Sequence, residues 1–130
     1  MLMSHKARKK VAVLLVNNET ARNAMRDVLG GAGFEVRQDV GACQIAEVGF
    51  IGAYFALLGV VRQVRAIDPL LPLVIVRNGD HELGTELELH QDYYDVIKLD
   101  YSNEVDVRQK FSRWFSEGHG KVLVGSGRNK

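Results

Sequence analysis

The run Val11–Glu19 (VAVLLVNNE) constrains the fold of this chain more than any other stretch. Its apolar part, Val11–Val16, is continuous and rich in valine, which is typical of a strand in a parallel sheet that is covered on both faces. The run ends at Asn17 and Asn18, and either amide can cap a helix that begins there. The sequence therefore predicts a buried strand that leads directly into a helix, the first unit of a parallel α/β sheet.

After this unit the chain alternates between short apolar runs and amphipathic segments. The further predicted strands are Phe34–Val40, Tyr54–Leu58, Leu73–Val76 and Val96–Leu99. The first predicted helix follows Asn18 and ends at Gly30–Gly33, a short weak one covers Gly41–Val48, and a third runs from Val60 to Ile67 and stops at Asp68 and Pro69. An acidic helix is predicted over His81–Gln91. The last helix is capped by Ser102 or Asn103, and its Trp114 is expected in the protein core. Five strands that alternate with five helices predict the α/β class, as a doubly wound five-stranded parallel sheet.

Composition and charge indicate an ordinary single-domain globular protein. The 130 residues are 46% hydrophobic and 25% charged, with a net charge of +1 that favours neither nucleic acid nor a membrane as direct partner. A lone cysteine, Cys43, excludes an internal disulfide, and with no membrane-spanning run or secretory signal a cytoplasmic location is expected. We divide the chain into a basic N-terminal extension (1–10), a folded domain (11–117) and a tail or linker to a following domain (118–130).

Four stretches carry a resemblance to a known family. They are LLVNNE at 14–19, VLGGAGFEV at 28–36, VRQVRAIDPLLPLVIV at 61–76 and DYYDVIKLDYS at 92–102. Over Lys10–Glu117 the chain resembles the receiver domain of bacterial two-component response regulators. The resemblance implies a flavodoxin-like, three-layer sandwich, and it puts Lys98 at the lysine that the family keeps at the end of its fifth strand.

In that family an aspartate at the end of the third strand accepts a phosphoryl group. Two acidic residues after the first strand help to bind Mg²⁺, a threonine or serine after the fourth strand contacts the phosphate, and an aromatic residue on the fifth strand responds to it. The resemblance assigns these residues to the pocket: Asn17 and Asn18 in place of the acidic pair, Glu19 beside them, Gly59 in place of the acceptor, Arg77 in place of the threonine, Asp95 in place of the aromatic residue, and Lys98. The connection after the third strand is also shorter than in the family.

The missing carboxylates predict a vestigial phosphorylation pocket. No Asp or Glu occurs between Glu47 and Asp68, so a small shift of the alignment restores no acceptor. We therefore expect no catalytic residue, no metal, no cofactor and no enzymatic activity.

A receiver-like domain without an acceptor is expected to act by contact. The first hypothesis is a pseudo-receiver in signal transduction or transcription regulation, which works independently of phosphorylation through a protein partner or as a homodimer. The candidate interface residues, near the fifth strand and the last helices, are Tyr93, Tyr94, Asp100, Tyr101 and Arg113. The second hypothesis is a small-molecule sensor, in which Arg77 and Lys98 hold a nucleotide or another anion over the strand ends.

Three details stay open in the sequence. As switch-position residues, Arg77 and Asp95 either form an ion pair that locks the switch surface or stay exposed. Lys98 either binds Glu19 or an anion, or only neutralises carbonyl dipoles at the strand ends. The run Leu123–Ser126 (LVGS) is similar to the start of the ATPase domain in sigma-54-type transcription activators, which would make this chain the N-terminal domain of a longer regulator.

Overall fold

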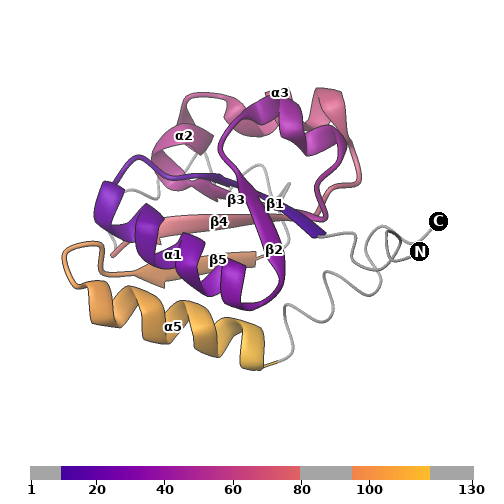
Figure 1. Cartoon of the computed structure of the whole chain (residues 1–130). Coiled ribbons are helices and arrows are strands. Elements are labelled where there is room, and N and C mark those ends of the chain that lie inside the picture. The colour runs from indigo at the N-terminus through magenta and orange to yellow at the C-terminus, as the bar shows by residue number, and fades with distance from the viewer. Residues whose placement is uncertain (1–9, 80–94, 118–130) are drawn as a thin grey trace, which may run out of the picture.

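The computed structural model describes residues 10–79 and 95–117, which form a parallel sheet flanked by helices (Figure 1). The strands are β1 (Lys10–Leu15), β2 (Phe34–Arg37), β3 (Val48–Gly52), β4 (Leu73–Asn78) and β5 (Asp95–Leu99). Their order is β2-β1-β3-β4-β5, and each neighbouring pair is parallel. The predicted doubly wound five-stranded sheet is therefore confirmed.

The helices that follow β1 and β5 and the helix over Val60–Ile67 agree with the prediction, but the helix predicted over Gly41–Val48 is only a 3-10 turn, and Val48 already begins β3. The helical elements are α1 (Glu19–Gly31), the 3-10 turn η2 (Val40–Gln44), α2 (Ala53–Leu57), α3 (Val60–Ile67) and α5 (Glu104–Ser116). Asn18 and Asn103 are the caps, because their Oδ1 atoms accept hydrogen bonds from Ala21 N at 2.9 Å and from Asp106 N at 3.1 Å. None of these helices has the length and apolar composition needed to cross a bilayer. The predicted acidic helix over His81–Gln91 and the run Leu123–Ser126 lie outside the described residues.

The third strand differs from the prediction. β3 is Val48–Gly52, whereas the predicted strand Tyr54–Leu58 contributes the short helix α2. All of β3 is buried, and its two glycines lie where side chains have little room. A Cβ on Gly49 would lie 2.9 Å from Leu73 Cδ2, and one on Gly52 would lie 3.2 Å from the carbonyl oxygen of Leu15. The close approach of neighbouring strands therefore selects a glycine-containing segment over the more apolar run that follows it.

Alanine at two glycines should have opposite effects on stability. At Gly52 the added methyl group meets backbone, so we expect Gly52→Ala to lower the free energy of unfolding by on the order of 1 kcal/mol. At Gly30, inside α1, a Cβ meets nothing within 4 Å, so Gly30→Ala should raise it by about 0.5–1 kcal/mol. Chemical denaturation followed by circular dichroism measures both changes. A Gly52→Ala protein as stable as the wild type, or more stable, would contradict the close packing of β3 against β1.

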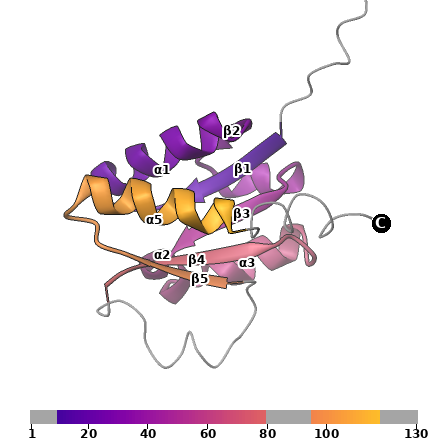
Figure 2. The same ribbon diagram turned by 90° about the horizontal axis from the view of Figure 1, so that it is seen from below.

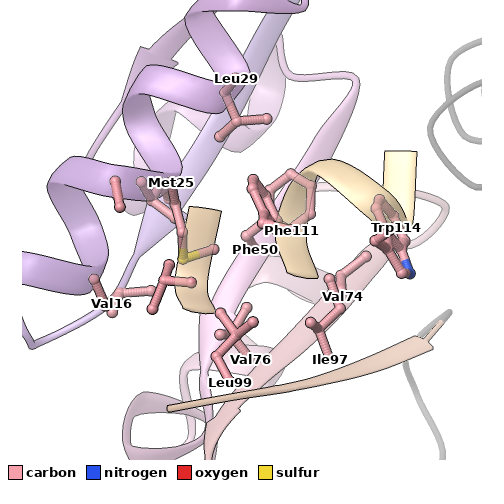
Figure 3. Packing of buried hydrophobic residues seen from close by; sticks show 14 of the residues in the cluster. Val16, Met25, Leu29, Phe50, Val74, Val76, Ile97, Leu99, Phe111 and Trp114 are labelled. Carbon is pink, nitrogen blue, oxygen red and sulfur yellow. The ribbon is translucent and has the colours of Figure 1, made fainter. Parts of the chain in front are cut away.

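Each face of the sheet carries its own core. α1 and α5 cover one face, and α2 and α3 cover the other (Figures 1 and 2). The α1/α5 core contains Phe50, Val74, Val76, Ile97 and, on the covering helices, Met25, Phe111 and Trp114 (Figure 3). The α2/α3 core contains the alternate strand residues, among them Val13, Ile51, Leu73 and Ile75. This alternation fixes which face each residue at the strand ends belongs to.

Cys43 lies fully buried in the α2/α3 core. Burial, helped by the negative charges of Asp68 and Asp39, raises the pKa of its thiol from 9.0 to about 11. The folded protein therefore keeps the thiol protonated at a pH where the unfolded chain already releases the proton.

This raised pKa predicts a stability that declines in alkali. We expect the free energy of unfolding to be unaffected by Cys43 below pH 9.0 and to fall as the pH rises from there towards about 11. In mildly alkaline solution, iodoacetamide should label Cys43 in urea-unfolded protein much faster than in native protein. Equal labelling rates, followed by mass spectrometry, would contradict the burial of the thiol.

Candidate functional site

The carboxyl end of β1 presents amides and a guanidinium. Asn17 is exposed, and the Asn18 side chain is engaged as the cap of α1. Arg22 reaches back from α1, and its Nη1 donates to the carbonyl oxygen of Val16 at 3.0 Å. Glu19 is exposed in the first turn of α1 and makes no ion pair with Lys98. A positive charge fixed at this strand end disfavours a divalent cation there, and residues 10–79 and 95–117 contain no cluster of metal-ligating side chains.

Gly52, rather than Gly59, ends the third strand. Gly59 instead caps α3 with a left-handed backbone (φ 93°), and its carbonyl oxygen accepts a hydrogen bond from Arg62 N. The assignment of Gly59 to the acceptor position is wrong, because it depended on the predicted strand over Tyr54–Leu58. The short connection inferred after that strand arose from the same error, since α2 occupies the connection between β3 and α3. Gly52 also lacks a side chain that could accept a phosphoryl group.

Arg77 and Lys98 place two positive charges on neighbouring strands. They are register partners at the carboxyl ends of β4 and β5. Val76 and Ile97, the residues before them, belong to the α1/α5 core, so Arg77 and Lys98 lie on the α2/α3 face. Arg77 is half-buried and Lys98 is exposed. Because like charges directly opposite one another repel, this arrangement favours an anionic group close to both.

Asp95 lies away from Arg77 and binds α5. Its register partner is Val74, three positions before Arg77, which is about 10 Å along the strand. Asp95 also shares a face with Ile97, opposite to the face of Arg77. Its Oδ2 accepts a hydrogen bond from Trp114 Nε1 at 2.8 Å. The register and the alternation of side chains thus argue against the predicted Arg77–Asp95 ion pair. Asp95 instead connects the start of β5 to α5.

Tyr101, one of the predicted interface residues, is buried in the core. Its side chain is 3% exposed, its hydroxyl donates to the carbonyl oxygen of Val76 at 3.3 Å, and its N–H donates to Asn78 Oδ1 at 3.0 Å. Its apolar ring is buried and its hydroxyl is hydrogen-bonded within the core, so the prediction that Tyr101 belongs to an interface is wrong. Asp100 and Arg113 are exposed as predicted, and Tyr93 and Tyr94 lie outside the described residues. Hydrogen bonds from Ser102 hold the pKa of Asp100 below its ordinary value.

Two polar residues of this edge were missed by the sequence analysis, namely Arg22 and Asn78. The sequence pattern indicates an outward-facing helix residue at Arg22, but Arg22 lies in the first turn of α1 and its side chain turns back to Val16 at the strand end. Asn78 lies two residues beyond the end of the predicted apolar strand, and that position could have marked it. Its partner Tyr101 is remote in sequence, so the contact itself had no sequence signal. The prediction that Trp114 is a core residue is confirmed, since it is 7% exposed.

Comparison with known proteins finds likeness in structure alone. No protein-family model and no curated protein matches the chain. NtrX from Brucella abortus, in complex with ADP, matches 88% of this chain with a TM-score of 0.54 and 16% identity, and the chain spans 28% of the length of that protein. An orphan response regulator of H. pylori matches over 82% of this chain and 94% of its own, with a TM-score of 0.57 and 14% identity.

A third structure decides the fold. The CheY-like protein TadZ from Pseudomonas aeruginosa matches over 95% of this chain and 99% of its own, with a TM-score of 0.54 and 18% identity. The chain has the fold of a response-regulator receiver domain. In such parallel α/β sheets, ligands bind outside the carboxyl ends of the strands. The edge formed by Asn17, Gly52, Arg77 and Lys98 is therefore the candidate functional site of this receiver-like fold.

Proposed function

We propose that this chain is a receiver-like domain of signal transduction or transcription regulation that works without phosphorylation, through contact with protein. The single observation behind the proposal is the absence of carboxylates where the phosphoryl chemistry needs them. Asn17 and Asn18 follow β1, Gly52 ends β3, and the stretch from Val48 to Ile67 contains no acidic residue. Without a carboxylate at the end of β3, no acyl phosphate can form there.

The charges at this edge support the same proposal. Magnesium is bound by carboxylates and by phosphate oxygens, whereas the polar groups at these strand ends include Arg22, Arg77 and Lys98. With Asn17 and Asn18 in place of the acidic pair and three basic side chains nearby, the site repels a cation.

In this proposal the signal passes by contact with a partner protein or with a second copy of the chain. On the β5–α5 side, Asp100 and Arg113 are exposed and available to such a contact. As the N-terminal domain of a longer regulator, the chain would correspond to one part of a protein such as NtrX, of which it spans 28%, whereas it spans 99% of TadZ. Light scattering of wild type and of Arg113→Glu distinguishes the two routes. A dimer that the substitution dissociates supports self-association through α5, and a wild-type monomer supports a different partner.

Acetyl phosphate tests the proposal directly. We expect no phosphoryl adduct on any carboxylate after incubation with acetyl phosphate and Mg²⁺, as read by intact-mass spectrometry. An active receiver domain with its full acidic set, treated in the same tube, is the positive control. A stoichiometric, acid-stable but hydroxylamine-sensitive adduct on this chain would overturn the proposal.

Anion sensing is the second candidate, and the pairing of Arg77 with Lys98 is the observation that favours it. Two cations in register can hold a phosphate group without a metal. Thermal unfolding with inorganic phosphate, ATP and ADP in the presence of EDTA tests this function. A rise in Tm that Arg77→Ala abolishes and Arg113→Ala leaves intact would support sensing. An unchanged Tm with all three ligands would exclude it for these ligands.

A further inference from the structure

Six apolar residues, Ala53–Leu58, follow β3 without a polar interruption. Only part of this segment is used in folding, because Ala53 is buried while Phe55 and Ala56 pack against the α2/α3 core. Tyr54 is 47% exposed and Leu58 is 61% exposed. The Tyr54 ring meets Phe55 edge-on at a centroid distance of 5.6 Å, and Leu58 directly follows the last residue of α2. Singly exposed apolar residues are common on protein surfaces, and it is a contiguous exposed apolar patch that marks an interaction site.

Tyr54 and Leu58 belong to a surface that continues into α3. They are four residues apart along a helical segment and therefore lie on the same side of it. Gly59, with φ 93°, turns the chain from α2 into α3, and a Cβ built there meets nothing within 4 Å, so the turn is open. Arg62 follows one turn later and is exposed. We call the surface formed by Tyr54, Leu58, Gly59 and Arg62 the α2–α3 corner.

The charge of the α2–α3 corner indicates the chemistry of its partner. Between Val48 and Ile67 the charged residues are Arg62 and Arg65, and none is acidic. Arg65 is turned inward, where its Nη1 donates to the carbonyl oxygens of Leu71 at 2.7 Å and Asp68 at 3.3 Å. Arg62 therefore supplies the exposed charge beside the apolar pair. A complementary segment would carry acidic residues around one or two apolar anchors.

We propose that the α2–α3 corner is a docking site for an acidic segment with apolar anchors on another protein. A second copy of this chain is a poorer occupant, because a two-fold interface through the corner places Arg62 near its own counterpart with no acidic residue of α2 or α3 to offset it. The inference rests on the proposed function, since it names the surface and partner class for signalling by contact. It depends on different residues from those tested with acetyl phosphate.

A random-peptide display library, selected on the wild-type protein, tests the proposal. We expect the recovered peptides to combine acidic residues with leucine or aromatic anchors. Labelled copies of them should bind at least about tenfold more weakly to Leu58→Ser, because burial of one leucine side chain supplies that much affinity. Arg62→Glu should weaken binding as well, and added salt should weaken binding to the wild type.

Val105→Ser is the matched control, because Val105 is equally exposed, at 61%, but lies on α5 at the other face of the sheet. It should leave the affinity unchanged. Recovery of no binder, of basic or uncharged binders, or of binders that Leu58→Ser does not weaken would overturn the proposal. A homodimer that Leu58→Ser dissociates would overturn it too, in favour of a second copy. None of these results alters the outcome with acetyl phosphate, so the two proposals fail separately.

Discussion

Phe111→Ala is expected to lower the free energy of unfolding by about 3–5 kcal/mol, the largest effect of any single substitution discussed here. Phe111 is fully buried at the centre of the α1/α5 core. Its ring meets Phe50 of β3 edge-on at a centroid distance of 5.1 Å (Figure 3), and it meets Phe115 edge-on at 5.4 Å. Removal of the ring leaves a cavity between α5 and the central strand that these rigid neighbours cannot fill. Urea denaturation followed by circular dichroism measures the loss.

Val105→Ala is the control for this experiment. Val105 lies on the same helix, but it is 61% exposed, so its truncation should change the free energy of unfolding by less than about 0.5 kcal/mol. If the two substitutions had similar effects, α5 would not pack on the sheet through Phe111.

The second large effect is a coupling between Asp95 and Trp114. A hydrogen bond to a charged group contributes about 1.5–3 kcal/mol, and we expect a double-mutant cycle of Asp95→Ala with Trp114→Phe to give a coupling energy in this range. Trp114→Phe keeps most of the ring in the core and removes the Nε1 donor, so the cycle isolates the hydrogen bond. Chemical denaturation of the four proteins supplies the free energies.

A cycle of Arg77→Ala with Asp95→Ala is the matched comparison. Because the two residues lie three register positions apart and on opposite faces, their coupling should be close to zero. A strong Arg77–Asp95 coupling with none for Trp114 would restore the lock that the sequence suggested. The expected result instead makes Asp95 a fixed anchor between β5 and α5, at the position that the resemblance matches to the responsive aromatic residue of receiver domains.

The sequence predicted most of the fold because local signals were strong. β1 and β4 carry continuous apolar runs, and asparagines mark the starts of α1 and α5. The third strand was misassigned because Tyr54–Leu58 is more apolar than Val48–Gly52 and has no glycine. Glycine weakens a strand by its own conformational preference, yet a central strand needs it where the neighbours come close. That requirement exists only once Leu15 and Leu73 are in place beside β3.

At the candidate site, residue types were readable and their mutual positions were not. The sequence showed that Asn17 and Asn18 stand at the end of β1, and that no carboxylate is available between Glu47 and Asp68. It could not show that Asp95 turns to Trp114 or that Tyr101 turns inward to Val76, since each contact joins residues far apart in the chain. Nor could it show that Arg77 and Lys98 lie opposite each other on neighbouring strands, because this depends on the register of β4 and β5.

The order of amino acids alone therefore determined the alternation of strands and helices, and the loss of acidic chemistry at the strand ends. Both depend on residue type and on spacing within one element. Only the tertiary structure decided which glycine ends the third strand, which face each charge lies on, and which apolar residues remain outside the core. These are set by register and by the close packing of neighbouring elements, which act between residues that are distant in sequence.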